Sequence, residues 1–276
     1  MNDLYILTNP LNTMNKIVID IKDIVNYIYC PQYYEFYNTK EDPTMTQLYN
    51  ECIHSTFYAY LLSLQNDTLD DTVGFLKYNW GKQWIKHKTS KDLLLSHVRE
   101  NTTYRNNYDA RRKRGIDAIL KFNKIMLNDK QFPIIINHKY EIEILPNIIL
   151  TGTLEYVREL TIGEHKVIQV IKFLSENNRF DTNIEHQYNL ELIAMSYAFQ
   201  TLFDVQEFQT IIIDIEKEKI YINYYSNKDY NYLKNTIKNT VISIQNNLKI
   251  VSPNKQCFHC GYRNKCLQTF EGGQIC

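Results

Sequence analysis

The stretch KVIQVIKFL, residues 166–174, decides how the fold is interpreted. It is rich in β-branched residues and apolar on both faces, which is typical of a strand in the middle of a sheet. Two further apolar stretches precede it, residues 132–144 and 148–159, and Pro146-Asn147 between them predicts a turn. We therefore expect these two stretches to form a β-hairpin beside a central strand.

The rest of the chain alternates between helical and strand-like patterns. The expected elements, in chain order, are a short strand and helix within 17–29, helices at 43–66, 70–87 and 99–127, the three strands above, a helix at 184–202, strands at 208–215 and 219–225, and a helix at 229–248. Asp20 is expected to cap the first helix and Pro31 to end it. This order predicts one α/β domain with a helical insertion, and no second independent domain.

The composition is that of an ordinary globular protein of 276 residues, with 44% hydrophobic and 22% charged residues. The 31 Lys and Arg residues balance the 31 Asp and Glu residues, which excludes a histone-like protein but allows a local basic segment. No apolar run approaches the roughly 18–20 residues of a membrane helix, and the first residues lack a secretory signal. We expect a cytoplasmic protein without membrane contact.

The cysteines carry the strongest local pattern. Cys257, Cys260 and Cys266 form a C-x2-C-x5-C cluster near the C-terminus. Two thiolates separated by two residues can bind one metal, and a reducing cytosol disfavours disulfides. The spacing predicts a metal or cluster site and is compatible with zinc and with iron–sulfur. The candidates for a fourth ligand are Cys30, Cys52, His259 and Cys276.

The segment YCPQYYEFY, residues 29–37, links this cluster to a known family. It resembles the cysteine–proline–aromatic segment of the RecB-family iron–sulfur nucleases, which include the CRISPR-associated adaptation exonuclease and AddB-type nuclease domains. They belong to the PD-(D/E)XK superfamily, and the resemblance spans roughly residues 20–268. It implies a restriction-endonuclease-like mixed sheet flanked by helices, within a single domain 1–276.

The resemblance also implies how this domain is divided and closed. The helical part would span 20–128, the α/β core 129–250 and a cluster-binding tail 251–276. A 4Fe–4S cluster would be bound by four cysteines: Cys30, Cys257, Cys260 and Cys266. Closing a loop of more than two hundred residues would restrict the unfolded chain and stabilise the fold.

Further motifs resemble the catalytic centre of this family. His54 on the second expected helix matches the metal-ligating histidine, and LTGTLE, residues 150–155, is similar to G-x-x-D with Glu155 as the acid. VIQVIK, residues 167–172, resembles the D-x-K strand, with Lys172 as the residue that activates water. The resemblance implies Mg²⁺ or Mn²⁺ bound by His54, Glu155 and the carbonyl of Ile171.

Two more positions correspond to the Q-x-x-x-Y motif of this family, which contacts DNA. Gln187 matches the glutamine, whereas Glu191 stands where the family has tyrosine. A second departure is Val170, which occupies the acidic position of the D-x-K strand and cannot bind a cation. Gln169 is expected to face the other side of the strand. The carboxylates considered as replacements are Glu141, Glu143 and Glu176.

The features expected to contact nucleic acid are a basic segment and a group of aromatic residues. The basic segment, Arg111, Arg112, Lys113 and Arg114, could neutralise phosphates or form a solvated helix face. Tyr33, Tyr34, Phe36 and Tyr37 could stack single-stranded bases or pack around the cluster. The expected partners are DNA that is single-stranded or has free ends, and other proteins of a DNA-processing complex.

Three functional hypotheses follow from the sequence. The leading one is an iron–sulfur nucleic-acid-binding protein of the RecB-like nuclease fold that acts in DNA processing with weak or lost cleavage. The alternatives are an active Mg²⁺- or Mn²⁺-dependent DNA exonuclease with a shifted ligand set, and a structural scaffold subunit of a larger protein complex.

Overall fold

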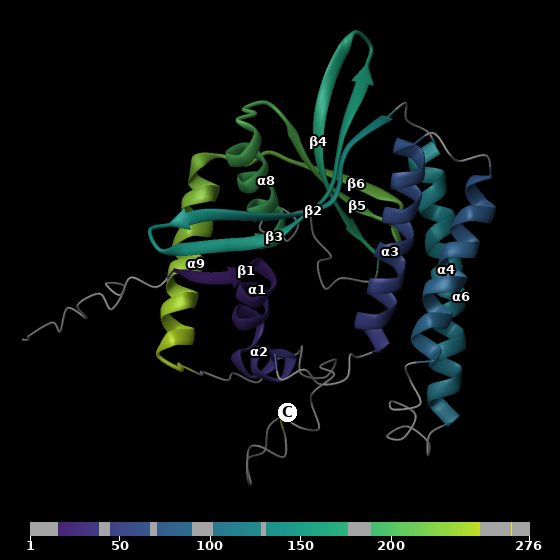
Figure 1. Ribbon diagram of the computed structural model, residues 1–276, viewed down its shortest axis with the longest axis horizontal. Helices are drawn as coiled ribbons and strands as arrows, with labels where there is room; N and C mark the ends of the chain where they lie inside the picture. The colour runs from purple at the N-terminus through teal and green to yellow at the C-terminus, as the bar shows by residue number, and fades with distance from the viewer. Residues whose placement is uncertain are drawn as a thin grey trace, which may run out of the picture.

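The computed structural model describes residues 16–38, 45–66, 71–89, 102–127, 131–175 and 189–248, together with Cys266. Within these ranges the chain forms a mixed α/β fold, in which helices flank a six-stranded sheet on both faces (Figure 1). None of the described helices is long and apolar enough to cross a membrane.

The strands confirm the expected order and the central position of the third apolar stretch. They are β1 (Ile17–Asp20), β2 (Gln131–Leu145), β3 (Ile148–Ile162), β4 (His165–Leu174), β5 (Gln209–Asp214) and β6 (Lys219–Asn223). The strand order is β1-β3-β4-β5-β6, and β2 pairs with β3. β4 is antiparallel to β3 and parallel to β5. Pro146 and Asn147 form the expected turn between β2 and β3.

Six of the described helices lie close to their expected ranges, and α2 is a further helix that the sequence did not predict. The described helices are α1 (Ile21–Tyr29), α2 (Pro31–Asn38), α3 (Met45–Gln65), α4 (Thr72–Thr89), α6 (Thr102–Leu127), α8 (Leu190–Phe203) and α9 (Asn227–Gln245). Asp20 caps α1 as expected, because its carboxylate accepts a hydrogen bond from the Lys22 N–H at 2.8 Å. Pro31 starts α2, where its missing N–H costs no helical hydrogen bond.

The two faces of the sheet are covered by different helices (Figure 1). One face packs on α1, α8 and α9 through a core that includes Leu150, Val170, Ile193 and Leu233. The other face packs on α3, α4 and α6 through an aromatic-rich core. In this second core the rings of Phe57 and Phe122 stack with centroids 3.9 Å apart.

β3 changes its neighbour halfway along its length, and this change positions the candidate site. On one side β3 pairs with β1 as far as Thr151 and with β4 from Tyr156 onward. Residues 152–155 have no strand partner on that side within the described chain, and we call this stretch the strand gap. Opposite Glu155, on β2, Asn137 has a left-handed φ of 49°. The gap therefore coincides with an irregular point of the hairpin, between the ends of β1 and β4.

Candidate functional site at the strand gap

Glu155 lies in the strand gap, where its carboxylate accepts two hydrogen bonds from β4. Its Oε2 accepts the backbone N–H of Phe173 at 3.0 Å, and its Oε1 accepts a hydrogen bond from Lys172 Nζ at 2.9 Å. Burial opposes ionisation of this carboxyl group. The charges of Lys172 and His54 and the Phe173 N–H outweigh burial and lower the pKa of Glu155. Glu155 is therefore a carboxylate at neutral pH.

Lys172 joins Glu155 to a second carboxylate. Lys172 Nζ also donates to Glu191 Oε2 at 2.5 Å, and both side chains are largely buried. Burial alone would lower the pKa of Lys172, but the two carboxylates raise it above its usual value. Lys172 is therefore an ammonium ion held between Glu155 and Glu191, and we call these three residues the charged cluster.

Glu191 reaches the cluster from the first turn of α8. The Asn189 side chain caps this helix by accepting the Leu192 N–H at 3.1 Å. The first turn of a helix favours negative charge, because its unpaired N–H groups carry the positive end of the helix dipole. The helix terminus thus stabilises the Glu191 carboxylate next to the strand gap.

His54 approaches the cluster from α3, on the opposite face of the sheet. Its Nδ1 lies 3.9 Å from Glu155 Oε2, and its Nε2 lies 3.4 Å from Ser175 Oγ. Ser175 Oγ in turn donates to Asn50 Oδ1 at 3.0 Å. Burial lowers the pKa of His54 below its usual value, in spite of the opposing charge of Glu155. The imidazole is therefore neutral at pH 7 and can offer a nitrogen lone pair to a ligand.

The structure brings together His54, Glu155 and Lys172, three residues that the sequence predicts for the site. Val170 is fully buried on the α8 face of β4, the face that Lys172 also occupies, as expected from strand alternation. Ile171 is buried at the end of the β3–β4 pairing. Sequence reasoning missed Glu191 as a site residue. The signal that could have found it is the apolar Val170 where the resemblance implies an acid, together with the acidic Glu191 where it implies a tyrosine.

Two of the three carboxylates considered as replacements, Glu141 and Glu143, do not reach the charged cluster. Glu141 and Glu143 are exposed on β2, and Glu143 accepts the Asn147 N–H at 3.2 Å. They alternate with the buried Tyr140 and Ile142, so a period of two directs them away from the core face. Glu176 lies outside the described residues, as does Gln187.

Gln169 does not substitute for the missing acid either. It faces the side of β4 opposite to Lys172, as expected, and β4 shows no register shift against β3 or β5. Its amide oxygen accepts a hydrogen bond from Arg158 Nε at 2.7 Å, and its amide nitrogen donates to Gln209 Oε1 at 2.8 Å. We call Arg158, Gln169 and Gln209 the amide row.

The basic segment lies on α6 and is only partly available to a ligand. The guanidinium groups of Arg111 and Arg114 lie over the Tyr49 ring, 5.7 Å and 5.9 Å from its centroid. Arg114 also forms an ion pair with Glu216 in the turn between β5 and β6. Arg112 and Lys113 are exposed. The exposed pair is therefore better placed than Arg114 to contact a phosphate.

The cysteines expected to bind a cluster are described only in part. Cys30 is the C-cap of α1, and its N–H donates to the Asn26 carbonyl at 3.0 Å. Cys52 is fully buried in the core between the sheet and α3, α4 and α6. Cys266 is partly buried. The remaining candidate ligands lie outside the described residues: Cys257, His259, Cys260 and Cys276.

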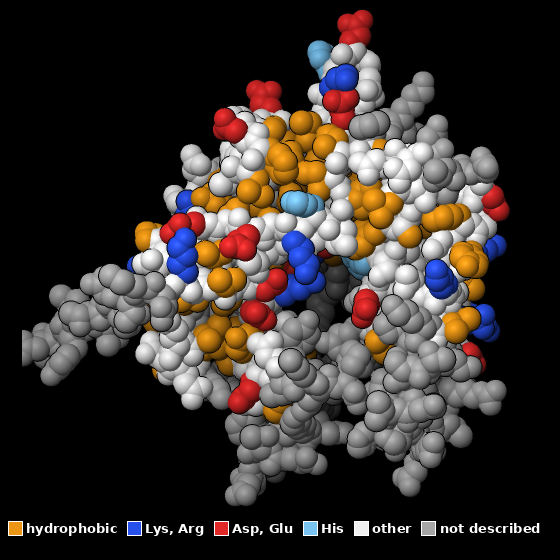
Figure 2. All heavy atoms as spheres, viewed as in Figure 1, with side chains coloured by type: hydrophobic (Ala, Val, Ile, Leu, Met, Phe, Trp, Pro, Cys, Tyr) orange, Lys and Arg blue, Asp and Glu red, His pale blue; other side chains and the backbone are white. Residues whose placement is uncertain are grey.

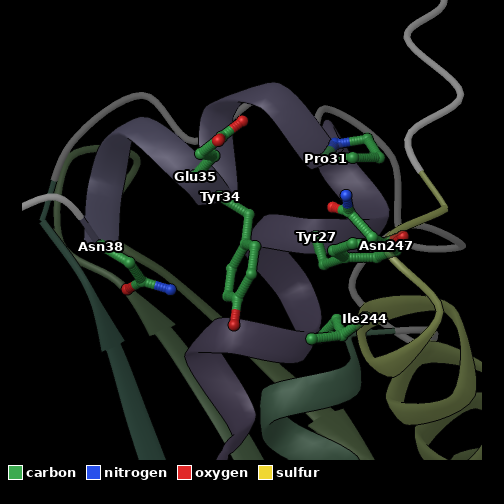
Figure 3. A pocket seen from close by; sticks show the side chains of 7 residues that line it. All are labelled: Tyr27, Pro31, Tyr34, Glu35, Asn38, Ile244 and Asn247. Carbon is green, nitrogen blue, oxygen red and sulfur yellow. The ribbon is translucent and has the colours of Figure 1, made fainter.

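The aromatic residues after Cys30 pack against α1. Tyr34 contacts Tyr27 and Tyr33 contacts Tyr29, both edge to face, with ring centroids 5.6 Å and 5.4 Å apart. Phe36 is buried. A pocket of about 340 Å³ opens beside them, lined by Tyr27, Tyr34 and residues of α2 and of the end of α9 (Figure 3). None of the residues that line this pocket belongs to the charged cluster.

The surroundings of the strand gap mix both signs of charge. Figure 2 shows Lys or Arg and Asp or Glu side chains around a recess at the centre of this face, between the sheet and α3. No three His, Cys, Asp or Glu side chains of the described ranges converge closely enough to hold a metal ion. At the charged cluster the Lys172 ammonium lies between the two carboxylates, within hydrogen-bond distance of each.

Comparisons with known proteins add little to this geometry. No protein-family model and no curated protein matches the chain. One solved structure that resembles it is described as the crystal structure of SSO0001, with 13% sequence identity and a TM-score of 0.32. The match covers 67% of this chain and 80% of that one. At this TM-score the likeness supports no conclusion about fold family or function.

Proposed function

We propose that this protein is a DNA-processing nuclease of the PD-(D/E)XK type, which hydrolyses phosphodiester bonds with a divalent cation at the strand gap. The observation that carries the proposal is the position of Glu191. It brings a second carboxylate to Lys172, 2.5 Å from its ammonium group, although Val170 stands where the acid is expected on β4. The proposal therefore favours the shifted ligand set over a degenerate centre.

The side chains at the gap suit a hard cation in their chemistry. Glu155 and Glu191 offer carboxylate oxygens, and the neutral His54 offers a ring nitrogen, all of which Mg²⁺ or Mn²⁺ accepts. Glu155 Oε2 and His54 Nδ1 already lie 3.9 Å apart. A cation bound there would polarise a phosphoryl oxygen and lower the pKa of a bound water. The Glu191 carboxylate would bind the same cation after its side chain had turned away from Lys172.

The chain's own groups prepare the site for this chemistry. The Phe173 N–H holds one oxygen of Glu155, which fixes the orientation of the carboxylate. Lys172 remains charged and can stabilise the negative charge that develops on a phosphoryl oxygen or orient the attacking water. Ser175 lies between Asn50 and the His54 ring, which favours one orientation of the imidazole.

The position of the basic segment supports a nucleic-acid substrate. Tyr49, which contacts Arg111 and Arg114, precedes His54 by five residues on α3, or about 7.5 Å along the helix axis. The exposed Arg112 and Lys113 lie on the same helix as these arginines. A backbone that enters the strand gap could therefore reach cationic groups at the α3–α6 contact.

The decisive experiment is a cleavage assay on the full chain with single- and double-stranded oligonucleotides and Mn²⁺ or Mg²⁺. Wild type should cleave, and Glu191→Gln should reduce the rate by at least about 10- to 100-fold, because the variant removes an anionic ligand of the cation. Glu207→Gln changes an exposed acid before β5 and serves as the matched control. Electron paramagnetic resonance of Mn²⁺ should show weaker binding to Glu191→Gln only. Full activity of Glu191→Gln would contradict the proposed ligand set.

The second candidate is a nucleic-acid-binding protein that does not cleave. It is favoured by the ion pairs of Lys172, because an ammonium between two carboxylates can take the place of a cation. In that case wild type binds oligonucleotides in a salt-dependent manner, shows no Mn²⁺ binding, and leaves the DNA intact. The same assay therefore separates the two candidates.

We further propose that Cys30 binds a 4Fe–4S cluster together with Cys257, Cys260 and Cys266. Cys30 lies at the elbow between α1 and α2, where its side chain is only partly buried. Protein purified without oxygen should be brown and contain about four iron atoms per chain, the content of one such cluster. Cys30→Ala should lose the iron, whereas Cys52→Ala should keep it. Colourless protein with one zinc ion would contradict the cluster.

A further inference from the structure

Tyr140 presents an unusual hydroxyl group at the strand gap. It lies on β2 opposite Gly152, the first residue of the gap, and its side chain is 3% exposed. A Cβ atom at Gly152 would lie only 2.4 Å from the Tyr140 hydroxyl oxygen. The absence of a side chain at Gly152 therefore makes room for this hydroxyl against the backbone of β3, three residues before Glu155.

The Tyr140 hydroxyl has no hydrogen-bond partner in the described part of the protein. A buried hydroxyl without a partner is destabilising, because it loses its hydrogen bonds to water and gains none from the protein. Phenylalanine would fill the same space without this cost. Tyr140 therefore carries a hydroxyl group that makes no hydrogen bond within the described fold.

The surroundings of Tyr140 favour a hydrogen-bond donor. Asp20 and Glu191 are its acidic neighbours and Lys172 its basic one. Burial raises the pKa of Tyr140 above its usual value, and the two acids raise it further. The hydroxyl therefore keeps its proton at neutral pH. It can donate a hydrogen bond but cannot act as a base.

We propose that the Tyr140 hydroxyl donates a hydrogen bond to a phosphoryl oxygen of a nucleic-acid backbone bound at the strand gap. This inference rests on the proposed function for the identity of the ligand, but it does not require cleavage. A phosphoryl oxygen is a strong acceptor that would arrive with the substrate and satisfy the unpartnered donor. Tyr140 would then help to place the phosphodiester beside Lys172.

The test compares Tyr140→Phe with Tyr225→Phe. Tyr225 is a suitable control, because its hydroxyl is also buried and without a partner among the described residues, but its acidic neighbour is Asp229. Both variants should melt at or above the wild-type temperature, since each removes an unsatisfied hydroxyl. In EDTA, Tyr140→Phe should bind a short single-stranded oligonucleotide about tenfold more weakly, the loss expected for one hydrogen bond to a charged group. Tyr225→Phe should bind as wild type does.

The outcomes distinguish this inference from the proposed function. If wild type does not cleave but Tyr140→Phe still loses affinity, the contact stands and the nuclease proposal fails. If wild type cleaves and Tyr140→Phe binds and cleaves normally, the nuclease proposal stands and the contact is refuted. A Tyr140→Phe variant with a lower melting temperature than wild type would also refute it, because the hydroxyl would then have a partner within the fold.

Discussion

Two groups of polar residues, the amide row and the charged cluster, are each centred on one residue of β3 and one of β4, and they differ in what surrounds them. In the amide row, Arg158 and Gln169 face each other within the paired part of the two strands. In the charged cluster, Glu155 and Lys172 lie just beyond the last pair, Tyr156 with Ile171. The first group has a continuous ladder of backbone hydrogen bonds around it, and the second has the strand gap.

This difference indicates different roles. Within a paired sheet, buried polar side chains satisfy one another and fix the register of the strands, because a slip would leave them without partners. Where the pairing stops, side chains from both faces and from both strand ends can converge. Glu155 meets Lys172, which also binds Glu191, on one face and lies near His54 on the other. We therefore expect mutations in the row to affect stability and mutations in the cluster to affect activity as well.

The largest effect is expected for Lys172→Met. This change leaves Glu155 and Glu191 buried without their shared cation, and breaking such a buried pair costs about 3–5 kcal/mol of the free energy of unfolding. Urea unfolding measures the loss, and cleavage should be abolished. Lys166→Met on the same strand removes an exposed ion pair with Glu159 and should cost less than about 1 kcal/mol. Equal losses in the two variants would contradict the assignment of the buried pair.

A smaller effect on stability is expected for Gln169→Leu. It removes two hydrogen bonds, the one from Arg158 and the one to Gln209, and the loss of such buried hydrogen bonds costs about 1–3 kcal/mol. Cleavage per folded molecule should stay at the wild-type level, as measured well below the melting temperature. Gln206→Leu, at an exposed amide pair with Gln200, is the control for stability. A selective loss of cleavage in Gln169→Leu would erase the distinction between row and cluster.

The smallest effect concerns pH and His54. Because burial holds the pKa of His54 below the usual 6.5, the unfolded chain binds a proton more readily than the folded one. The contribution of His54 is complete above pH 6.5 and is lost as the pH falls from 6.5 toward the folded pKa, by at most about 1.4 kcal/mol per pH unit. Glu155, whose pKa is also lowered, loses its contribution only below about pH 4.5.

Urea unfolding between pH 7 and pH 5 tests this dependence. His54→Asn should show a flatter profile than wild type, because the residue that resists protonation is gone. His165→Asn, at the exposed first residue of β4, is the matched histidine control. A wild-type protein that becomes more stable as the pH falls over this interval would show that His54 prefers the protonated state.

The sequence by itself predicted the order of the strands and of every described helix except α2, and it predicted three residues that the structure brings together at the strand gap. Apolar stretches of β-branched residues and the Pro146-Asn147 turn define the hairpin and the central strand, because strand formation depends on local pattern. Asp20 and Pro31 mark the ends of α1 for equally local reasons. His54, Glu155 and Lys172 were found through motif resemblance, and the two-residue period of a strand placed Val170 and Lys172 on one face.

Only the tertiary structure decided how the site is completed. Glu191 is nineteen residues from Lys172 in sequence, on a helix whose first turn meets the sheet at the strand gap. No local rule predicts that contact, because it depends on how α8 packs on β4. The same is true of Tyr140, whose hydroxyl lies against Gly152 across the hairpin. Local propensities place residues on elements, whereas packing between elements determines which side chains share a site.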